Sequence, residues 1–258
     1  MPRRALLFLV ASFVVLVCPG AGLAKKHGKS AAARSYAGQE LKLLCTASGV
    51  YEMFISSGAL KIVSKSIGIS LRSVAPDWDV VLSRDDVRQF QRLPYARAMK
   101  MDLSPFYLYS VRKELVKPSG TGDARVQNRI CKLYVFKGDY DSSFAWKGSF
   151  LGTGTRSNEM DLIALAQAGL DKPGAIVYRL FGIPRQSGCP IILMSKRTDG
   201  SQGFMLKLLS VKDATMPASA FVIPSGYKEV GPDKKSIFFN VEQKKDLELF
   251  STPQKGSL

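Results

Sequence analysis

Histidine is almost absent from this chain of 258 residues. The single one, His27, lies among small and basic residues near the amino terminus. Serine and cysteine nucleophiles commonly need a histidine as proton acceptor, and many zinc sites use histidine as a ligand. The composition therefore excludes most Ser/His and Cys/His catalytic sites, and it excludes histidine-rich metal sites.

Cysteine is also scarce. Besides Cys18, near the amino terminus, the chain has Cys45, Cys131 and Cys189, which are too scattered for the spacing of a zinc site. In an oxidising compartment these three allow at most one internal disulfide with one thiol left over, and the sequence does not choose among the pairings. The alternative is three small buried side chains.

The chain has one long apolar run, Ala5 to Val17, which is thirteen residues against the roughly 20 that a membrane-spanning helix needs. Arg3 and Arg4 precede it and Ala24 closes a small-residue segment after it, which is typical of a secretory signal cleaved after Ala24. We therefore expect an exported chain, periplasmic or extracellular, with no transmembrane segment. Lipid attachment at Cys18 is the alternative, but a valine precedes it where that processing favours a small side chain.

Acidic residues are few relative to basic ones. Without residues 1–24, the chain has 35 basic and 21 acidic residues and a net charge of +14. Such a protein is attracted to anionic membranes or polymers, and export makes nucleic acid the least expected partner. Residues 25–37 carry part of this charge without apolar periodicity and are expected to form a flexible basic leader, with 38–258 as a single domain. The excess charge has the alternative role of keeping the protein soluble.

A two-residue alternation of apolar and polar side chains predicts strands. It runs through Ile67 to Arg72 and resumes at Trp78 to Leu82 after the turn sequence Ala75-Pro76-Asp77, which predicts a hairpin. A second hairpin is expected around Asp199-Gly200. Its strands are 191–197 and 203–211, and further strands are expected at 130–136, continuing past a turn at 138–139, and at 236–241.

Helices are expected in fewer places. Ser83 is a candidate N-cap for a helix that Pro94 ends, and Asn158 for another whose apolar face includes Met160, Ile163 and Leu170. Helix is favoured for 99–116, an exposed loop is expected at 117–123, and 173–182 fits a helix or a strand. Sheet therefore dominates, with a few helices interposed.

The stretch ASAFVIPSGYKEV, residues 218–230, combines a short apolar burst with turn residues. Phe221 begins a short edge or anchor segment, and Pro224 stops strand pairing because it has no amide hydrogen. Ser225-Gly226 then permits a chain reversal, after which Tyr227 places its ring over the sheet end with its hydroxyl hydrated. The pattern is typical of a lid hinge on a curved sheet.

A hairpin at 204–211, a polar link and the motif Phe221, Pro224, Gly226 and Tyr227 resemble the closing part of the LolA/LolB-like periplasmic half-barrels, including their uncharacterised relatives. The resemblance covers about residues 203–230. It implies an α+β, mainly β fold in which a curved antiparallel sheet forms an incomplete barrel around a few helices. It also implies an apolar concavity that binds lipid or the acyl chains of lipoproteins.

Other motifs do not lead to a catalytic site. Gly28-Lys29-Ser30 lacks the upstream glycine spacing of a phosphate loop, and the segment from Asp139 has Phe144 where a calcium loop needs glycine. Ser-x-x-Lys occurs at Ser110 and at Ser225, without the partner motifs of the serine enzymes that use it. We expect no catalytic residues, no metal and no cofactor, although an enzyme that uses Ser/Lys or Asp/Glu stays open.

The function expected from the sequence is therefore an exported, non-catalytic binding or carrier protein for an apolar ligand, a lipid or an acylated protein. The alternative is a structural or adhesive envelope protein that binds an anionic polymer or membrane through its basic charge. The candidate ligand-binding residues share an aromatic side chain able to line an open mouth, with ordinary core packing as the alternative. They are Trp78, Phe90, Phe106, Tyr107, Tyr109, Phe181 and Phe204.

Overall fold

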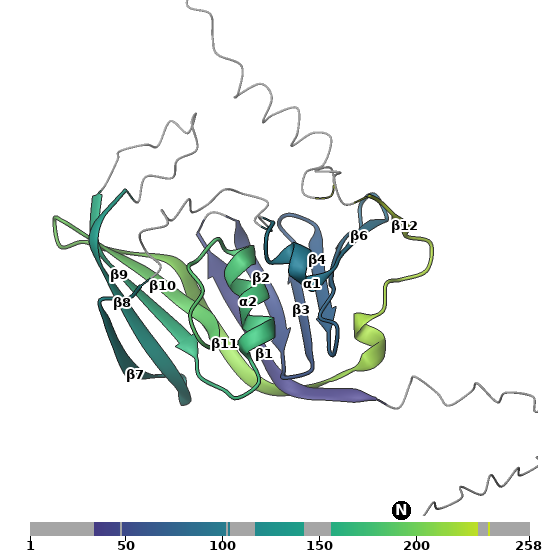
Figure 1. Ribbon diagram of the computed structural model, residues 1–258, viewed down its shortest axis with the longest axis horizontal. Coiled ribbons are helices and arrows are strands. Elements are labelled where there is room, and N and C mark those ends of the chain that lie inside the picture. The colour runs from purple at the N-terminus through teal and green to yellow at the C-terminus, as the bar shows by residue number, and fades with distance from the viewer. Residues whose placement is uncertain are drawn as a thin grey trace, which may run out of the picture. The chain divides into compact units, whose positions relative to one another are not determined.

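A curved sheet of twelve strands, open at both edges, dominates a computed structural model of the protein (Figure 1). The structure describes residues 34–46, 48–101, 103, 117–141, 156–231 and 237, all within one compact unit, Ala31–Leu258. The strand order is β12-β6-β5-β4-β3-β2-β1-β11-β10-β9-β8-β7, antiparallel throughout except for the parallel pair β12 and β6. This confirms the expected mainly β fold with an incompletely closed antiparallel sheet and few helices.

The elements fall in two groups along the chain. The first comprises β1 (Ser35–Cys45), β2 (Gly49–Ile55), β3 (Ala59–Ser64), β4 (Ile69–Val74), β5 (Val80–Arg84), β6 (Gln89–Leu93) and α1 (Tyr95–Ala98). The second comprises β7 (Gly120–Val126), β8 (Arg129–Asp141), β9 (Arg156–Leu165), α2 (Asp171–Leu180), β10 (Cys189–Arg197), β11 (Gln202–Pro217), the 3₁₀ helix η3 (Ala218–Phe221) and β12 (Lys228–Glu229). β1 begins inside the range 25–37 expected as leader. β11 joins the groups by pairing with β1.

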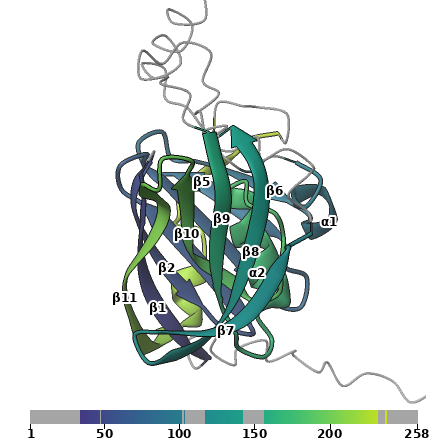
Figure 2. The ribbon, with the colours of Figure 1, turned by 90° about the vertical axis from the view of Figure 1, so that its left-hand side faces the viewer.

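The sheet has an inner face, against which α2 packs, and an outer face. Figure 2 shows the strands curving around α2. The inner face carries buried apolar side chains at every second position of the strands, such as Leu60 and Ile62 in β3 and Val80 and Leu82 in β5. These residues belong to one continuous core that also includes α2.

The backbone of α2 lies close to the backbone at the start of β10. A Cβ on Gly174 would lie 2.1 Å from the carbonyl oxygen of Gly188, so no larger residue fits there without a shift. Pro173, in the first turn, and Gly182, just after the end with a φ of +62°, match the usual places of these residues in a helix. The structure thus selects helix from the two alternatives for 173–182.

Both hairpins predicted from alternation are confirmed. β4 pairs with β5 around a turn that contains a cis peptide bond before Pro76, and β10 pairs with β11 around Asp199-Gly200. The strand expected at 130–136 is the middle of β8. No turn occurs at Gly138-Asp139: β8 continues to Asp141, and the two residues fall at a shift in its register with β9.

Two predicted helices are wrong. From Ser83 the chain completes β5, turns at 85–88 and returns as β6, with Asp86 Oδ1 accepting the Val87 amide hydrogen (3.0 Å) in the turn. The segment after Asn158 is β9, because Met160, Leu162 and Ala164 point to one side of a strand between β8 and β10. The acidic residues that suggested helix starts have other places: Asp85 and Asp86 lie in the turn, and Asp161 points to the outer face of β9.

The loop expected at 117–123 is also corrected, since its second half belongs to β7. Gly120 and Asp123 pair with Val135 and Lys132 of β8, so this polar segment is held as an edge strand by backbone hydrogen bonding. The helix expected at 99–116 and the strand at 236–241 lie outside the described residues, apart from residues 99–101, 103 and 237.

Cys45, Cys131 and Cys189 are all buried free thiols, which agrees with the alternative of small buried side chains. In the described part of the chain, no helix has the length and apolar character needed to cross a membrane.

Candidate functional site

A small apolar recess lies between the inner face of β2–β5 and the end of α2. Its walls come from four strands because alternate residues of each strand point inward. The cavity has a volume of about 10 Å³, about the space of one water molecule. The lining residues are Tyr51, Ile62, Ser64, Ile67, Ile69, Leu71, Leu82, Leu103 and Leu180.

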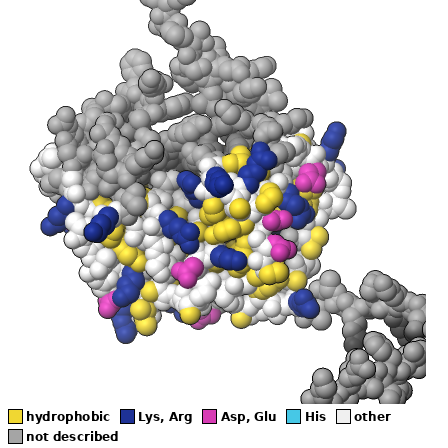
Figure 3. All heavy atoms as spheres, in the orientation of Figure 1, with side chains coloured by type: hydrophobic (Ala, Val, Ile, Leu, Met, Phe, Trp, Pro, Cys, Tyr) yellow, Lys and Arg dark blue, Asp and Glu magenta, His cyan; other side chains and the backbone are white. Residues whose placement is uncertain are grey.

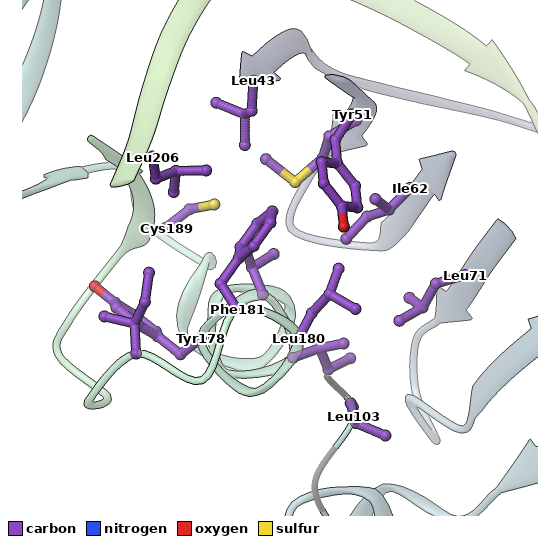
Figure 4. Packing of buried hydrophobic residues seen from close by; sticks show 14 of the residues in the cluster. Leu43, Tyr51, Ile62, Leu71, Leu103, Tyr178, Leu180, Phe181, Cys189 and Leu206 are labelled. Carbon is purple, nitrogen blue, oxygen red and sulfur yellow. The ribbon is translucent and has the colours of Figure 1, made fainter. Parts of the chain in front are cut away.

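Helix α2 and the residue after it fill the rest of the concavity. Figure 4 shows Phe181 pointing between Leu43, Leu206 and Tyr51, with Leu180 directed toward Leu71. The rings of Phe181 and Tyr51 meet edge to face, with centroids 5.1 Å apart. The inner face is therefore occupied by the chain's own side chains, so a larger ligand requires α2 to move.

Among the described residues, few side-chain polar contacts hold α2 in place. The Arg179 Nε donates a hydrogen bond to the carbonyl oxygen of Met99 (2.8 Å), and Lys172 lies 5.9 Å from the ring centre of Tyr95. No side chain in the described part of the chain caps the amino end of the helix at Leu170. A helix of ten residues is marginal on its own, so its apolar contacts with the sheet maintain it.

The polar groups at the recess are neutral. Burial raises the pKa of Tyr51 to about 12, and its hydroxyl donates to Ser48 Oγ (2.8 Å). Burial also raises the pKa of Tyr178 and of the Cys189 thiol on the sheet beneath α2. The recess is thus lined by uncharged groups, as an apolar ligand requires.

A buried arginine lies next to the apolar wall of the recess. Arg84 is directly opposite Ile69 in the sheet and is only 1% exposed. Its guanidinium makes a two-pronged contact with Asp86, with Nε 2.9 Å from Oδ1, and this contact lowers the pKa of Asp86. The Nη1 atom of Arg84 is buried without a hydrogen-bond partner.

A second, open cleft of about 480 Å³ lies where β1 pairs with β11, beside Gln167. Gln39, Asp213 and Thr215 contribute polar groups to it, and Gln39 Oε1 is buried without a partner. Asp213 is engaged by Arg129, with Nη1 3.0 Å from Oδ1. This cleft has a mixed lining, in contrast with the apolar recess.

The structure does not bring the predicted aromatic residues together. Trp78 and Phe181 lie in the core but do not line the recess. Phe90 is opposite Ser83, whose neighbour Leu82 points inward, so Phe90 is on the outer face. Phe106, Tyr107 and Tyr109 lie outside the described residues.

Phe204 lies on the outer face because the register between β10 and β11 shifts beside it. Leu206 pairs with inward-pointing Leu193, whereas Phe204 pairs with the next residue, Met194, because the register shifts between them. Phe204 is 41% exposed and lies under Lys207, whose Nζ is 5.2 Å from the ring centre. The recess residues that the prediction missed, such as Ile62 and Leu71, carry the alternation that identified the strands.

Residues 218–231, here called the strap, cross the outer face from the end of β11 to the edge at β6. Phe221 packs edge to face on Tyr36 and Phe54, with ring centroids 5.2 and 6.0 Å away, so it anchors the strap as expected. Gly226 occupies the predicted reversal with a φ of +85°. The hydroxyl of Tyr227, expected to be hydrated, donates to Asp85 Oδ1 (2.6 Å).

On the face seen in Figure 3, Lys and Arg side chains are interspersed among hydrophobic ones. The second Ser-x-x-Lys motif lies in the strap, where Ser225 is in a turn and Lys228 begins β12. Lys228 therefore does not lie one helical turn from Ser225, the arrangement in which it would activate the serine.

No protein-family model matches the sequence, and no curated protein matches it. Among solved structures, the chain is similar to an uncharacterised conserved protein from Thermus thermophilus, with 10% identity and a TM-score of 0.31 over 76% of this chain and 91% of that one. It is also similar to a putative outer membrane lipoprotein-sorting protein domain from Vibrio parahaemolyticus, with 9% identity and a TM-score of 0.22 over 83% of this chain and 91% of that one. At these values neither likeness assigns the chain to a family.

Proposed function

We propose that this chain is an exported, non-catalytic binding or carrier protein that takes an apolar chain, such as the acyl chain of a lipid or lipoprotein, onto the inner face of its sheet. The observation that carries the proposal is a continuous apolar inner face covered by a short helix with few polar ties. In the closed state α2 occupies the place of the ligand.

The size of ligand follows from what α2 gives up. Moving α2 exposes apolar side chains that are each worth about 1.5–3 kcal/mol of burial, namely Ile176, Val177, Tyr178, Leu180 and Phe181. A buried methylene contributes about 0.8 kcal/mol, so roughly 10 to 20 methylenes offset the loss. Long acyl chains therefore open the site, and short ones do not.

Two glycines allow such a movement without a break in the chain. Gly169 precedes α2 and Gly182 follows it, with φ values of +81° and +62°. Both lie where an L side chain is strained, and both adjoin the helix that has to move. They are suited to act as the hinges.

The experiment measures binding of a fluorescent fatty-acyl probe to delipidated protein without residues 1–24. We expect saturable binding that persists in high salt, because burial of apolar surface is little screened. Unlabelled fatty acids should compete more strongly as their chains lengthen. Absence of a saturable site would end the proposal, and binding that collapses with salt would favour envelope adhesion through the basic charge.

Three variants locate the site. Phe181→Ala weakens the seat of α2 and should tighten probe binding, whereas Ile67→Ser, in the recess wall, should weaken it. Leu209→Ser, at an exposed position of β11, is the matched control and should leave binding unchanged. If Phe181→Ala does not fold, Phe181→Leu tests the same direction with a smaller effect. Equal affinities for the Phe181 and Ile67 variants would contradict the placement of the ligand beneath α2.

A further inference from the structure

Two cations face each other on the outer side of the sheet, opposite the recess. Lys61 of β3 and Arg72 of β4 are direct cross-strand partners. Ile62 and Leu71, their neighbours along the chain, line the recess on the inner face, so both cations point outward. This site is separate from the proposed ligand site and does not rest on the proposed function.

The pair is partly removed from water. Arg72 is only 7% exposed; its Nη1 donates to Ser83 Oγ (2.6 Å), while its Nε is buried without a hydrogen-bond partner. Burial lowers the pKa of both cations, and the charge of Arg72 lowers that of Lys61 further. Like charges directly opposite each other destabilise an antiparallel pair.

No described carboxylate contacts this pair directly. Among the residues that the structure describes, neither Lys61 nor Arg72 has a carboxylate oxygen within 4.0 Å of its side-chain nitrogens. Asp85 is a counter-charge that acts on both cations at longer range, and it already accepts a hydrogen bond from the hydroxyl of Tyr227. Glu229 is opposite Phe90 at the sheet edge.

Several other cations on the outer face contact a carboxylate directly. Lys196 contacts both Glu159 and Asp161, and Lys212 lies 3.3 Å from Glu40. Near Lys61 and Arg72 the positive charge increases instead. Arg92 lies in the same cross-strand row, two strands from Arg72 and therefore about 10 Å away.

We propose that Lys61 and Arg72, beside the hydroxyl of Ser83, form a binding site for a phosphate group on the outer face of the sheet. A guanidinium donates two parallel hydrogen bonds to such an oxyanion, and a lysine ammonium adds a compact charge. The hydroxyl of Ser83, already an acceptor from Arg72, keeps its own hydrogen to donate. The anion supplies the charge that the described residues do not.

The first test is titration with inorganic phosphate at constant ionic strength, with sodium chloride as the balancing salt, followed by calorimetry and thermal unfolding. Saturable binding with a rise in Tm is expected. Lys61→Gln and Arg72→Gln should each weaken it at least tenfold. Lys65→Gln is the control, because Lys65 is exposed and already paired with Glu52 (3.2 Å). Lys61 is only half-buried, so Lys61→Gln should fold. It therefore tests the site even if Arg72→Gln does not fold.

The second test asks whether the phosphate is free or belongs to a lipid headgroup. Vesicles of phosphatidylcholine with phosphatidic acid are compared with pure phosphatidylcholine vesicles, using the same variants. Binding lost in Lys61→Gln and blocked by free phosphate identifies a headgroup site, and response to free phosphate alone identifies a soluble ion. If neither probe binds saturably, or if Lys65→Gln loses as much as Lys61→Gln, the site does not exist.

Discussion

Each face of the sheet buries an arginine, and the two arginines have different partners. Arg84, on the inner face, is 1% exposed and grips the carboxylate of Asp86. Arg72, on the outer face, is 7% exposed, bonds a serine hydroxyl and faces another cation. Arg84 therefore has a carboxylate in direct contact, whereas among the described residues Arg72 has none.

The largest expected difference between the faces concerns two phenylalanines. Phe181, in the inner core, is 2% exposed, and truncation of such a side chain costs about 3–5 kcal/mol. Phe204, on the outer face, is 41% exposed, so Phe204→Ala should cost less than about 1 kcal/mol. Urea unfolding of both variants measures this. Similar losses would show that the register shift does not place Phe204 outside the core.

The next effect compares Asp86 with its neighbour Asp85. Asp86→Asn removes the partner of a buried cation and should cost about 3 kcal/mol, at the low end for a buried pair because Asp86 is itself 43% exposed. Asp85→Asn is the comparison and should cost less, about 1 kcal/mol, since it loses one exposed hydrogen bond and only a longer-range attraction to Lys61 and Arg72. Equal costs would contradict the assignment of Asp86 as the carboxylate that stabilises buried Arg84.

The same pair predicts a pH dependence. The bond from Arg84 lowers the pKa of Asp86 below the value of about 3.9 in an unfolded chain. Its contribution to stability is therefore complete above about pH 4 and is lost as pH falls through the lowered pKa. The difference in unfolding free energy between the wild type and Asp86→Asn should be level near neutral pH and shrink below about pH 4. If the difference grows on acidification, the pKa of Asp86 is not lowered by folding.

A smaller effect on stability is expected where α2 packs against the start of β10. Gly174→Ala places a Cβ against the backbone of Gly188 and should cost about 1–3 kcal/mol, although alanine is the better helix former. Gly122→Ala in β7 is the control, because nothing lies within 4 Å of its added Cβ. Thermal unfolding of the two variants compares them. A gain in stability at Gly174 would show that α2 sits less tightly than described.

The smallest expected effect is at the cation pair. Lys61→Met removes a like-charge contact and should stabilise the protein by up to about 1 kcal/mol in chloride at low salt. The advantage should vanish when phosphate is added, because the wild type then gains a counter-ion. Loss of stability in both buffers would indicate that Lys61 has a favourable partner.

The sequence predicted strands best where alternation was clean. Ile69 and Leu71 in β4 and the hairpin of β10 and β11 kept a two-residue period through regular pairing. Prediction failed where local signals competed with the sheet. In β9 an N-cap residue and neighbouring apolar side chains imitated a helix, while pairing on both sides decided for a strand.

The candidate site was harder to predict than the fold. The predicted ligand-binding residues were aromatic side chains chosen individually. The wall of the recess is instead formed by alternate residues of several strands, such as Tyr51, Ile62 and Leu71. Their proximity depends on the order of strands in the sheet, which is a long-range property. The register shift that turns Phe204 outward leaves no mark in the sequence. Likewise, nothing local indicates that Lys61 is opposite Arg72.

The most direct test of the central claim uses Cys189 as a reporter. This fully buried thiol lies beneath α2, close to Gly174, and burial raises its pKa, so native protein should react slowly with a thiol reagent. In protein without residues 1–24, and therefore without Cys18, that also carries Cys45→Ser and Cys131→Ser, a long-chain fatty acid should speed labelling of Cys189 with the same concentration dependence as binding. If the fatty acid binds while Cys189 stays as protected as before, α2 does not move and the ligand does not enter the inner face.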